Sequence, residues 1–186
     1  MTTENEKNKI NIINQLNDEQ IFFDRLMKQN LELYQMNKII PGLYLGDDFV
    51  ARKREILSEY KITHVLNLTI NIPNKFEPEI SYLKINILDS ERQDIQKYFD
   101  DTFEFIDNAL KNKKNSVLVH CNAGISRSAS FVIAYLIKKG VFKSYQEAFE
   151  HVKKCRPIIA PNQGFVKQLQ QLESYKKDKN SFCIIS

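Results

Sequence analysis

Cys121 and Arg127 are separated by five residues in the segment HCNAGISRS, a spacing that suits the binding and cleavage of a phosphate ester. The segment follows a short apolar run and begins a predicted helix. A loop at such a place can point its backbone N–H groups inward, toward an anion, and the helix N-terminus adds positive potential. The residues that we predict to bind phosphate are Asn122, Ala123, Gly124, Ile125, Ser126 and Arg127.

Three features of this loop have separate chemical tasks. Gly124 allows the tight curl of the backbone. Arg127 can place its planar guanidinium on two phosphate oxygens, which the point charge of a lysine cannot do. Cys121 lies at the base of the predicted loop, where the helix N-terminus and a nearby cation favour the nucleophilic thiolate. The same positive potential therefore binds phosphate and prepares the nucleophile.

A thiolate that displaces an alkoxide or phenoxide needs an acid to protonate the leaving oxygen, and the later attack by water needs a base. One mobile carboxylate can do both. Asp89, in the polar loop after a predicted strand at residues 81–88, is our candidate. Asp94 is better explained as the N-cap of the helix that follows.

Five segments of the chain resemble the cysteine-based protein tyrosine phosphatase superfamily, and more closely its small, atypical dual-specificity members with only a catalytic domain. The resemblance covers about residues 38–175. The segments stand in family order and spacing and are IIPGLYLGD, ITHVLNLT, ILDSERQDIQKYFDDTFEFIDNAL, VLVHCNAGISRSAS and RPIIAPNQGFVKQLQQLE. A bare Cys-x5-Arg pattern would be weak, whereas the five segments together are specific.

The resemblance implies roles for individual residues. Cys121 is expected to be the nucleophile, Arg127 the phosphate ligand and Asp89 the general acid. Ser128 is expected to donate a hydrogen bond to the departing thiolate in the second step. His120 would support the cysteine loop, and Asn162 would brace the loop from the last helix. The family uses no metal, and we expect no cofactor.

The activity that the resemblance implies is hydrolysis of phosphotyrosine and phosphoserine or phosphothreonine in proteins through a phosphocysteine. Two alternatives are a phosphatase for phosphoinositides or RNA ends and a non-catalytic module that binds phosphate. Similar enzymes for highly charged lipids often carry basic residues between the cysteine and the arginine, but residues 122–126 are uncharged here. A non-catalytic module would lack the nucleophile or the acid, and both are present. Phosphorylated proteins are therefore the favoured substrates.

The elements that must position these residues form an α/β pattern. Short β-rich runs near residues 39–47, 62–68, 81–88 and 116–120 alternate with helical stretches, one of which Asp47 or Asp48 could cap. Residues 127–139 are apolar on all sides and predict a central helix that ends at Gly140. We expect a central, mostly parallel sheet with helices on both faces and a pocket at the strand ends, which the family resemblance implies to be shallow.

The remaining helices follow from cap signals. Ser144 to Glu147 spells a capping box, and Pro161 suits the first turn of a last helix that runs to about Lys176. Together with the length of 186 residues, the pattern predicts one catalytic domain at 38–176. We predict that residues 1–37 are a partly disordered extension with one peripheral helix. Residues 177–186 are predicted to be a basic tail.

Composition limits the partners. A net charge of +4 is too small to indicate nucleic acid, although it is compatible with an anionic substrate or membrane. Three scattered cysteines and three histidines predict neither a zinc site nor a disulfide framework. The polar start, and the absence of an apolar run near ~18 residues, predict a cytoplasmic protein.

Two terminal patterns suggest further partners. Basic residues precede an apolar pair at Arg25, Lys28, Leu31 and Leu33, as in peptides that bind MAP kinases, or these residues simply form the two faces of an N-terminal helix. The last four residues, CIIS, match a CaaX signal for farnesylation of Cys183. Three lysines, at positions 176, 177 and 179, would add attraction to an anionic inner membrane surface.

Overall fold

The computed structural model describes residues 35–182, with side-chain detail to residue 172. Residues 1–34 and 183–186 lie outside this part of the chain. The predicted N-terminal helix, the docking pattern between Arg25 and Leu33, and the lipidation signal at Cys183 therefore also lie outside the described residues and stay predictions.

A five-stranded sheet lies at the centre of the described domain, with the strand order β1-β2-β5-β3-β4. Neighbouring strands are parallel except for β1 and β2, which are antiparallel. The prediction of a mostly parallel sheet is confirmed. The strands are β1 (Asn37–Ile40), β2 (Leu43–Gly46), β3 (His64–Asn67), β4 (Ser81–Lys84) and β5 (Val117–His120).

Two predicted strands differ in extent from the observed ones. The β-rich run near residues 39–47 is a hairpin of two strands, because Pro41 and Gly42 make a turn in which Gly42 has φ +80°. The run at 81–88 is a strand only as far as Lys84, and the chain beyond it leads into the loop that carries Asp89.

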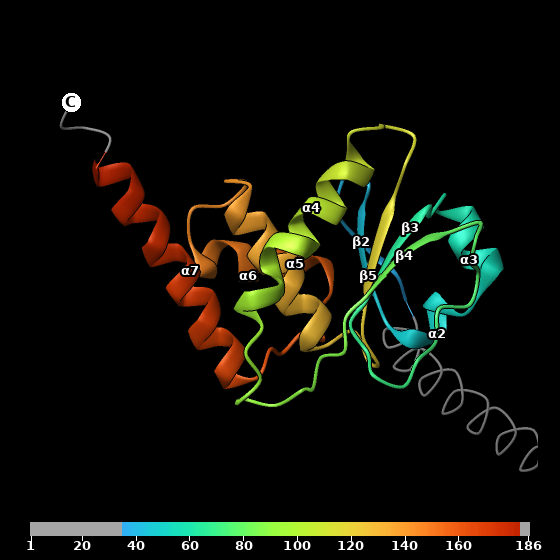
Figure 1. Ribbon diagram of the computed structural model, residues 1–186, viewed down its shortest axis with the longest axis horizontal. Helices are drawn as coiled ribbons and strands as arrows, with labels where there is room; N and C mark the ends of the chain where they lie inside the picture. The colour runs from blue at the N-terminus through green and yellow to red at the C-terminus, as the bar shows by residue number, and fades with distance from the viewer. Residues whose placement is uncertain (1–34, 183–186) are drawn as a thin grey trace, which may run out of the picture. The chain divides into compact units, whose positions relative to one another are not determined.

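Helices cover both faces of the sheet, as predicted (Figure 1). One face packs against α2 (Asp48–Ala51) and α3 (Arg54–Glu59) through a cluster that includes Val65 and Leu118. The other face contributes Leu66 and Val119 to a larger core. The elements of that second side are η1 (Gln96–Tyr98), α4 (Phe99–Leu110), α5 (Arg127–Lys138), α6 (Tyr145–Cys155) and α7 (Gln163–Phe182).

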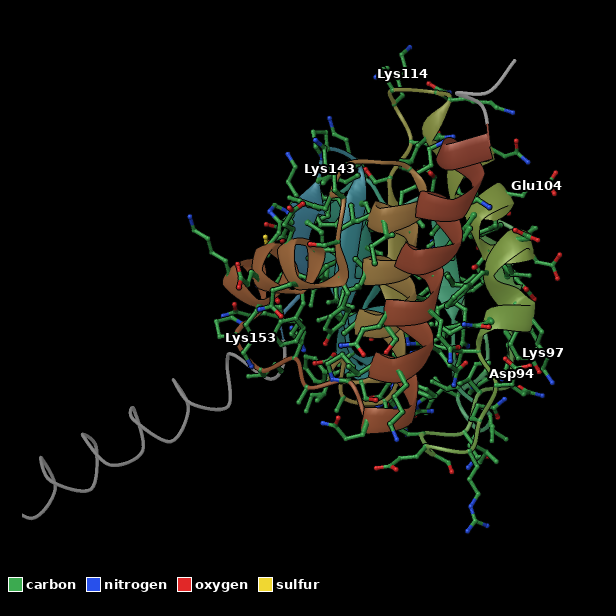
Figure 2. The ribbon with its side chains drawn as sticks, turned by 90° about the vertical axis from the view of Figure 1, so that its left-hand side faces the viewer. Asp94, Lys97, Glu104, Lys114, Lys143 and Lys153 are labelled. Carbon is green, nitrogen blue, oxygen red and sulfur yellow. The ribbon has the colours of Figure 1, made fainter. Side chains whose placement is uncertain are left out.

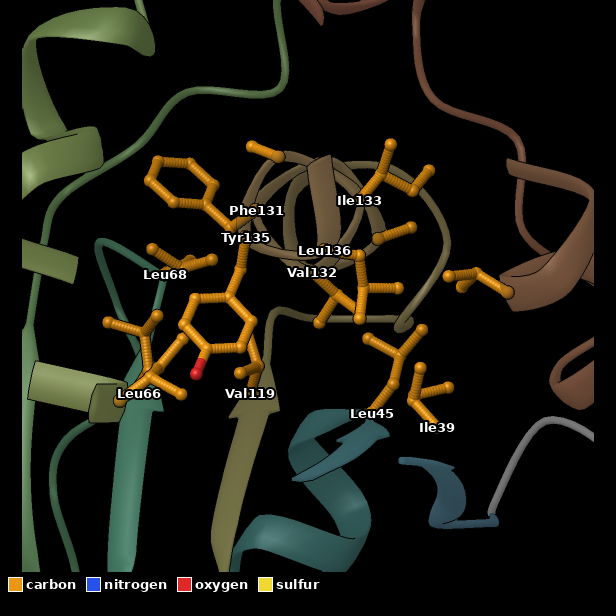
Figure 3. Packing of buried hydrophobic residues seen from close by; sticks show 14 of the residues in the cluster. Ile39, Leu45, Leu66, Leu68, Val119, Phe131, Val132, Ile133, Tyr135 and Leu136 are labelled. Carbon is orange, nitrogen blue, oxygen red and sulfur yellow. The ribbon is translucent and has the colours of Figure 1, made fainter. Parts of the chain in front are cut away.

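Helix α5 occupies the middle of the larger core. All residues from Ser128 to Ile137 are buried. Figure 3 shows Phe131, Val132 and Tyr135 among side chains of the sheet, including Leu66 and Val119. The helix ends where Gly140 takes φ +70° and donates its N–H to the Ile137 carbonyl. A helix held on all sides gives the loop before it a rigid base.

The cap predictions have mixed outcomes. Asp47 caps α2, with its carboxylate accepting from the Val50 N–H at 3.0 Å. The capping box of α6 is present, because Ser144 Oγ accepts from the Glu147 N–H at 3.2 Å. Pro161 lies outside α7, whose first turn is instead capped by the Asn162 side chain, which accepts from the Phe165 N–H at 2.9 Å.

Helix α7 also corrects the predicted end of the last helix. It continues beyond Lys176 to Phe182. The added segment contains neither glycine nor proline, the residues that most strongly end a helix, so no local signal stops it. Within residues 35–182, no helix combines the length and the apolar character needed to cross a membrane.

Candidate active site

The loop of residues 121–126 connects the carboxyl end of β5 to the first turn of α5. Gly124 has φ +67°, and a Cβ atom there would lie 2.6 Å from the Gly46 carbonyl oxygen. Both the backbone conformation and the space therefore require glycine. The curl that the sequence predicts at Gly124 is formed against the end of β2.

The backbone of this loop has a defined direction, because five consecutive carbonyl oxygens are held by donors around the loop. In a planar trans peptide the N–H points opposite to the preceding C=O, so the N–H groups of residues 122–126 face away from these donors, toward the concave side. This arrangement suits an anion. The five bonds are His120 Nδ1 to Cys121 O (3.2 Å), Asp48 N to Asn122 O (3.0 Å), Arg156 Nη2 to Ala123 O (3.1 Å), Arg156 Nε to Gly124 O (2.9 Å) and Ala160 N to Ile125 O (3.0 Å).

Arg127 spans the opening of the loop. Its Nη1 donates to the carbonyl oxygens of Leu68 and Ile87, both at 3.3 Å, and its Nη2 donates to Asn122 Oδ1 at 3.0 Å. Its Nε is buried without a hydrogen-bond partner among the described residues and lies 3.8 Å from Asp89 Oδ2. A guanidinium fixed in this way still has a donor to offer to a phosphate oxygen.

Cys121 lies buried under the loop, with 2% of its surface exposed. Ser128 Oγ donates a hydrogen bond to its Sγ over 3.2 Å. The neighbouring His120 is also buried, and burial lowers its pKa to about 4, with further lowering by the charges of Lys84, Arg127 and Arg52. His120 is therefore neutral at neutral pH, with the Nδ1 proton directed to the Cys121 carbonyl oxygen.

Asp89 reaches the rim of the same loop. Its Oδ1 accepts from Ser126 Oγ at 2.7 Å and from Asn162 Nδ2 at 2.9 Å. The backbone N–H of Asn162 donates to Ser126 Oγ at 3.2 Å, so Asn162 contacts both the loop and the predicted acid. The structure thus brings the predicted nucleophile, acid, phosphate ligand and supporting residues into one site. Asp94 lies apart from it and accepts from the Gln96 N–H at 3.0 Å, at the start of η1.

Arg156 also contacts this loop, although no sequence pattern indicated a role for it. It is fully buried, and besides the two loop carbonyls its Nη1 binds Gln35 O and Asn37 Oδ1, both at 2.7 Å. Asp47 Oδ2 lies 3.8 Å from its Nη2. Burial lowers the pKa of Arg156 and raises that of Asp47, and the attraction between the two opposes both shifts. Arg156 stands between a predicted helix and a proline, and this sequence context does not show whether an arginine is buried at the site or exposed to solvent.

The segment after Asp89 is also held by residues that the sequence analysis did not single out. Gln168 of α7 accepts from the Ile95 N–H at 2.8 Å and donates to Gln93 O at 2.9 Å. Gly164 packs so closely on the Glu91 backbone that a Cβ atom there would collide with it. Helix α7 therefore positions the loop that carries Asp89. The spacing of Gly164 and Gln168 on one helical face is the signal that could have indicated this contact.

Across the described part of the chain, no group of three or more His, Cys, Asp or Glu residues is placed to hold a metal ion. The groups assembled at the loop are a thiol, a carboxylate, a guanidinium, a hydroxyl and backbone N–H groups. Together they can bind a phosphate group, attack its phosphorus and transfer a proton to the leaving oxygen.

Comparison with known proteins identifies the arrangement. The family model of the dual specificity phosphatase catalytic domain matches residues 43–175. Human dual specificity protein phosphatase 1 is 43% identical over 137 residues, which are 74% of this chain and 37% of that protein. The dual specificity protein phosphatase 1 of Arabidopsis thaliana is 38% identical over 144 residues, 77% of this chain and 72% of that protein. The chain thus spans little more than a third of the length of the human protein and of two similar proteins from Xenopus laevis.

Solved structures show the same fold. The human tyrosine phosphatase-like serine/threonine/tyrosine-interacting protein superposes with a TM-score of 0.72 at 40% identity, over 77% of this chain and 98% of that one. DUSP15 superposes with a TM-score of 0.72 at 35% identity, over 77% of this chain and 90% of that one.

Proposed function

The chain belongs to the dual specificity phosphatase family, and we propose that it is an enzyme that removes phosphate from phosphotyrosine and from phosphoserine or phosphothreonine in proteins. The observation that carries the proposal is the position of Cys121 under the loop. Its thiol accepts from Ser128 Oγ, and Arg127 and Asp89 lie at the rim of the same loop. A nucleophile, a phosphate ligand and a proton donor are thereby present at one site.

In the first step, the Cys121 thiolate attacks the phosphorus atom of the substrate. The S–P bond forms as the P–O bond to the tyrosine, serine or threonine oxygen breaks, and the Asp89 carboxylic acid gives its proton to that oxygen. The inward-facing N–H groups of the loop and the Nε of Arg127 bind the other phosphate oxygens. The products are the free hydroxyl side chain and a phosphocysteine.

In the second step, water attacks the phosphocysteine. Asp89, now a carboxylate, takes a proton from this water, the S–P bond breaks, and inorganic phosphate leaves. The electron pair of that bond returns to sulfur as a thiolate, and the hydrogen bond from Ser128 Oγ, 3.2 Å from Sγ, stabilises the leaving thiolate. Asp89 ends the cycle protonated, ready for the next substrate.

The proposed substrate class is supported by the loop itself. The five residues between Cys121 and Arg127 carry no charge, which favours a single phosphate on a protein over a phosphoinositide or an RNA end. Phosphotyrosine, phosphoserine and phosphothreonine are all included because of the family match. A MAP kinase as substrate is a narrower proposal, which rests on the Arg25–Leu33 pattern alone.

A role without catalysis is the competing proposal. One structural neighbour is named a tyrosine phosphatase-like serine/threonine/tyrosine-interacting protein. That name describes the neighbour and not this chain. The presence of Cys121, Arg127 and Asp89 here favours the enzyme. A chromogenic aryl phosphate assay distinguishes the two roles, because a pure binding module binds phosphopeptides but releases no phosphate.

The test compares wild type with Cys121→Ser. We expect wild type to hydrolyse the aryl phosphate and phosphopeptides carrying each of the three phosphorylated residues. The serine variant should lose turnover and keep its fold and its phosphopeptide affinity, because the hydroxyl is nearly isosteric but far less nucleophilic. Activity retained by Cys121→Ser would overturn the proposal.

Farnesylation of Cys183 and attachment to the inner face of a membrane are a separate proposal about location. It is supported by the CIIS residues and the nearby lysines, and it applies where Ser186 ends the natural chain. Mass spectrometry of the C-terminus after expression in a eukaryotic cell tests it, with Cys183→Ser as the control. An unmodified terminus would contradict it without affecting the proposed activity.

A further inference from the structure

A second polar pocket, of about 300 Å³, opens at the end of α2 and is lined by Phe49, Arg52, Lys53 and Lys75. Three of the four lining side chains are cations, and none is a carboxylate. Lys75 comes from the loop between β3 and β4, so the three cations meet only in the folded chain. Nothing in the proposed hydrolytic steps uses this pocket.

The pocket is adjacent to the phosphate-binding loop. Asp48, the first residue of α2, donates its backbone N–H to Asn122 O of that loop at 3.0 Å, and Arg52 follows one helical turn later. The positive charge of Arg52 also acts on His120 at the base of the loop and contributes to the lowering of its pKa. The end of α2 that lines the pocket is therefore one helical turn from the wall of the loop.

The charge of the pocket is only partly neutralised. Arg52 pairs with Asp48 at 2.7 Å, and both side chains are partly exposed. Lys53 Nζ lies over the Phe49 ring, 5.0 Å from its centroid, and Lys75 Nζ donates to the Arg52 carbonyl oxygen at 3.3 Å. The contacts of the two lysines involve no carboxylate and neutralise no charge. The three cations of the pocket are therefore balanced by one carboxylate, that of Asp48, which leaves a net charge of +2.

Two nearby glutamates have other partners. Glu77 accepts from Asn74 Nδ2 at 3.0 Å, and Glu79 pairs with Arg54 at 3.5 Å. Both side chains are exposed and neither lines the pocket. Neither glutamate therefore neutralises the pocket, and its positive charge is available to a ligand from solvent.

We propose that the pocket of Phe49, Arg52, Lys53 and Lys75 is a specificity site that binds an anionic side chain of the phosphoprotein substrate. This inference rests on the proposed function, since it concerns residues next to the phosphorylated one. Four residues of helix advance about 6 Å, and an extended peptide advances about 3.4 Å per residue. The anionic group therefore lies at least about two residues from the phosphorylated residue.

The test measures kcat/KM on matched phosphotyrosine peptides with Glu or Gln two or three residues before or after the phosphotyrosine. Because exposed ion pairs are worth about 1.5- to 5-fold each, we expect wild type to favour the Glu peptide over the Gln peptide on the order of 5-fold on one side. High salt should reduce the ratio.

The pocket variant is Arg52→Gln/Lys53→Gln/Lys75→Gln, in which the ratio should fall to about one. The double variant Lys53→Gln/Lys75→Gln keeps the Arg52–Asp48 pair and should give an intermediate ratio, so a folding defect caused by loss of that pair is separable. Thermal unfolding checks that each variant is folded. A wild-type ratio of about one, or an unchanged ratio in the folded triple variant, would overturn the proposal.

The matched control is Lys61→Gln/Lys113→Gln/Lys114→Gln. These lysines line another pocket, of about 640 Å³, where β3 and β5 begin, and their replacement removes the same charge. Lys114 lies at the opposite end of the domain from Asp94 of the acid-bearing loop (Figure 2). The control should keep the wild-type ratio. An equal loss in both triple variants would show a general charge effect and contradict a specific site.

Binding provides a readout that does not need turnover. In the Cys121→Ser background, the affinity ratio of Glu to Gln peptides should follow the same order among the variants. If wild type hydrolyses no aryl phosphate, the proposed function fails. The ratio of affinities for Glu and Gln peptides then still shows whether the pocket binds an anionic side chain. Sedimentation with phosphatidylserine vesicles tests the alternative that the pocket binds an anionic membrane surface. Loss of vesicle binding with an unchanged peptide ratio would assign the pocket to lipid and overturn the proposal.

Discussion

Asp89 and Asp94 belong to one loop, but their carboxylates have different partners. Asp89 contacts Ser126 and Asn162 at the phosphate-binding loop, whereas Asp94 accepts from the Gln96 N–H at the start of η1. At the residue scale, the position of the carboxylate distinguishes the proposed proton donor from an aspartate that holds the turn before η1, since the two side chains are chemically identical.

We predict that Asp89→Asn lowers kcat by about 10²- to 10⁴-fold, because a positioned acid contributes about that much. The loss should be largest for peptide substrates with poor leaving groups and small for an activated aryl phosphate. The control Asp94→Asn should change little, since Asn caps helices about as well as Asp. Steady-state kinetics on both substrates measures the difference, and a larger loss for Asp94→Asn would reverse the assignment of the acid.

His120 gives the stability of the fold a defined dependence on pH. Burial holds its pKa at about 4, below the ordinary 6.5. Between these values the unfolded chain binds a proton that the folded chain does not, so stability falls as the pH falls through this range. The slope from this one group is at most about 1.4 kcal/mol per pH unit.

We therefore predict that His120→Asn flattens the decline in unfolding free energy between pH 6.5 and about pH 4. The amide can still donate to the Cys121 carbonyl oxygen but does not titrate. Urea unfolding of both proteins across this range measures the two slopes. Parallel curves would mean that the acid sensitivity of the fold comes from other groups.

At the scale of elements, Arg156 joins parts of the chain that share no local sequence. It follows α6, and it binds the phosphate-binding loop, Asn37 of β1 and the cap of α2 at Asp47. Because Arg156 and Asp47 are both buried, removal of the guanidinium leaves the Asp47 carboxylate without its charge partner and two loop carbonyls without a donor.

We predict that Arg156→Met lowers the free energy of unfolding by about 3–5 kcal/mol, as for other broken buried ion pairs. At temperatures where the variant is folded, kcat/KM on an aryl phosphate should also fall, because the Ala123 and Gly124 carbonyls lose the donor that directs the loop. Lys154→Met, on the exposed side of α6, is the control and should change neither quantity much. A stable Arg156→Met with full activity would contradict the positioning role.

At the scale of the whole domain, α5 connects the sheet with the outer helices. Phe131 is fully buried and meets the Phe99 ring of α4 edge to face at 5.5 Å between centroids. Helix α5 also begins at Arg127, so the helix at the centre of the core carries the proposed phosphate ligand. Stability of the core and geometry of the site are therefore linked.

We predict that Phe131→Ala costs about 3–5 kcal/mol of unfolding free energy, the usual range for a buried aromatic side chain. Val141→Ala, on a side chain that is 47% exposed, should stay within about 0.5 kcal/mol of wild type. Denaturant unfolding measures both. Similar losses in the two variants would mean that α5 does not dominate the core.

The amino-acid sequence was sufficient to predict the mostly parallel sheet, the central helix and the loop that places Cys121 between β5 and α5. The residues from His120 to Ser128 lie on one strand, one loop and one helix, so their relative positions follow from local geometry. The position of Asp89 beside this loop was also predictable, because it directly follows a predicted strand and the carboxyl ends of parallel strands meet at one edge of the sheet.

Other features depended on the tertiary structure. Arg156 binds groups more than 30 residues away in the sequence, and the pocket joins Arg52 to Lys75 from separate elements. An arginine or lysine suits a solvent-exposed position equally well, so residue type alone does not show which one is buried or which ones meet. Long-range packing placed Arg156 behind the phosphate-binding loop and the three cations beside it, because only the folded chain brings these distant segments together.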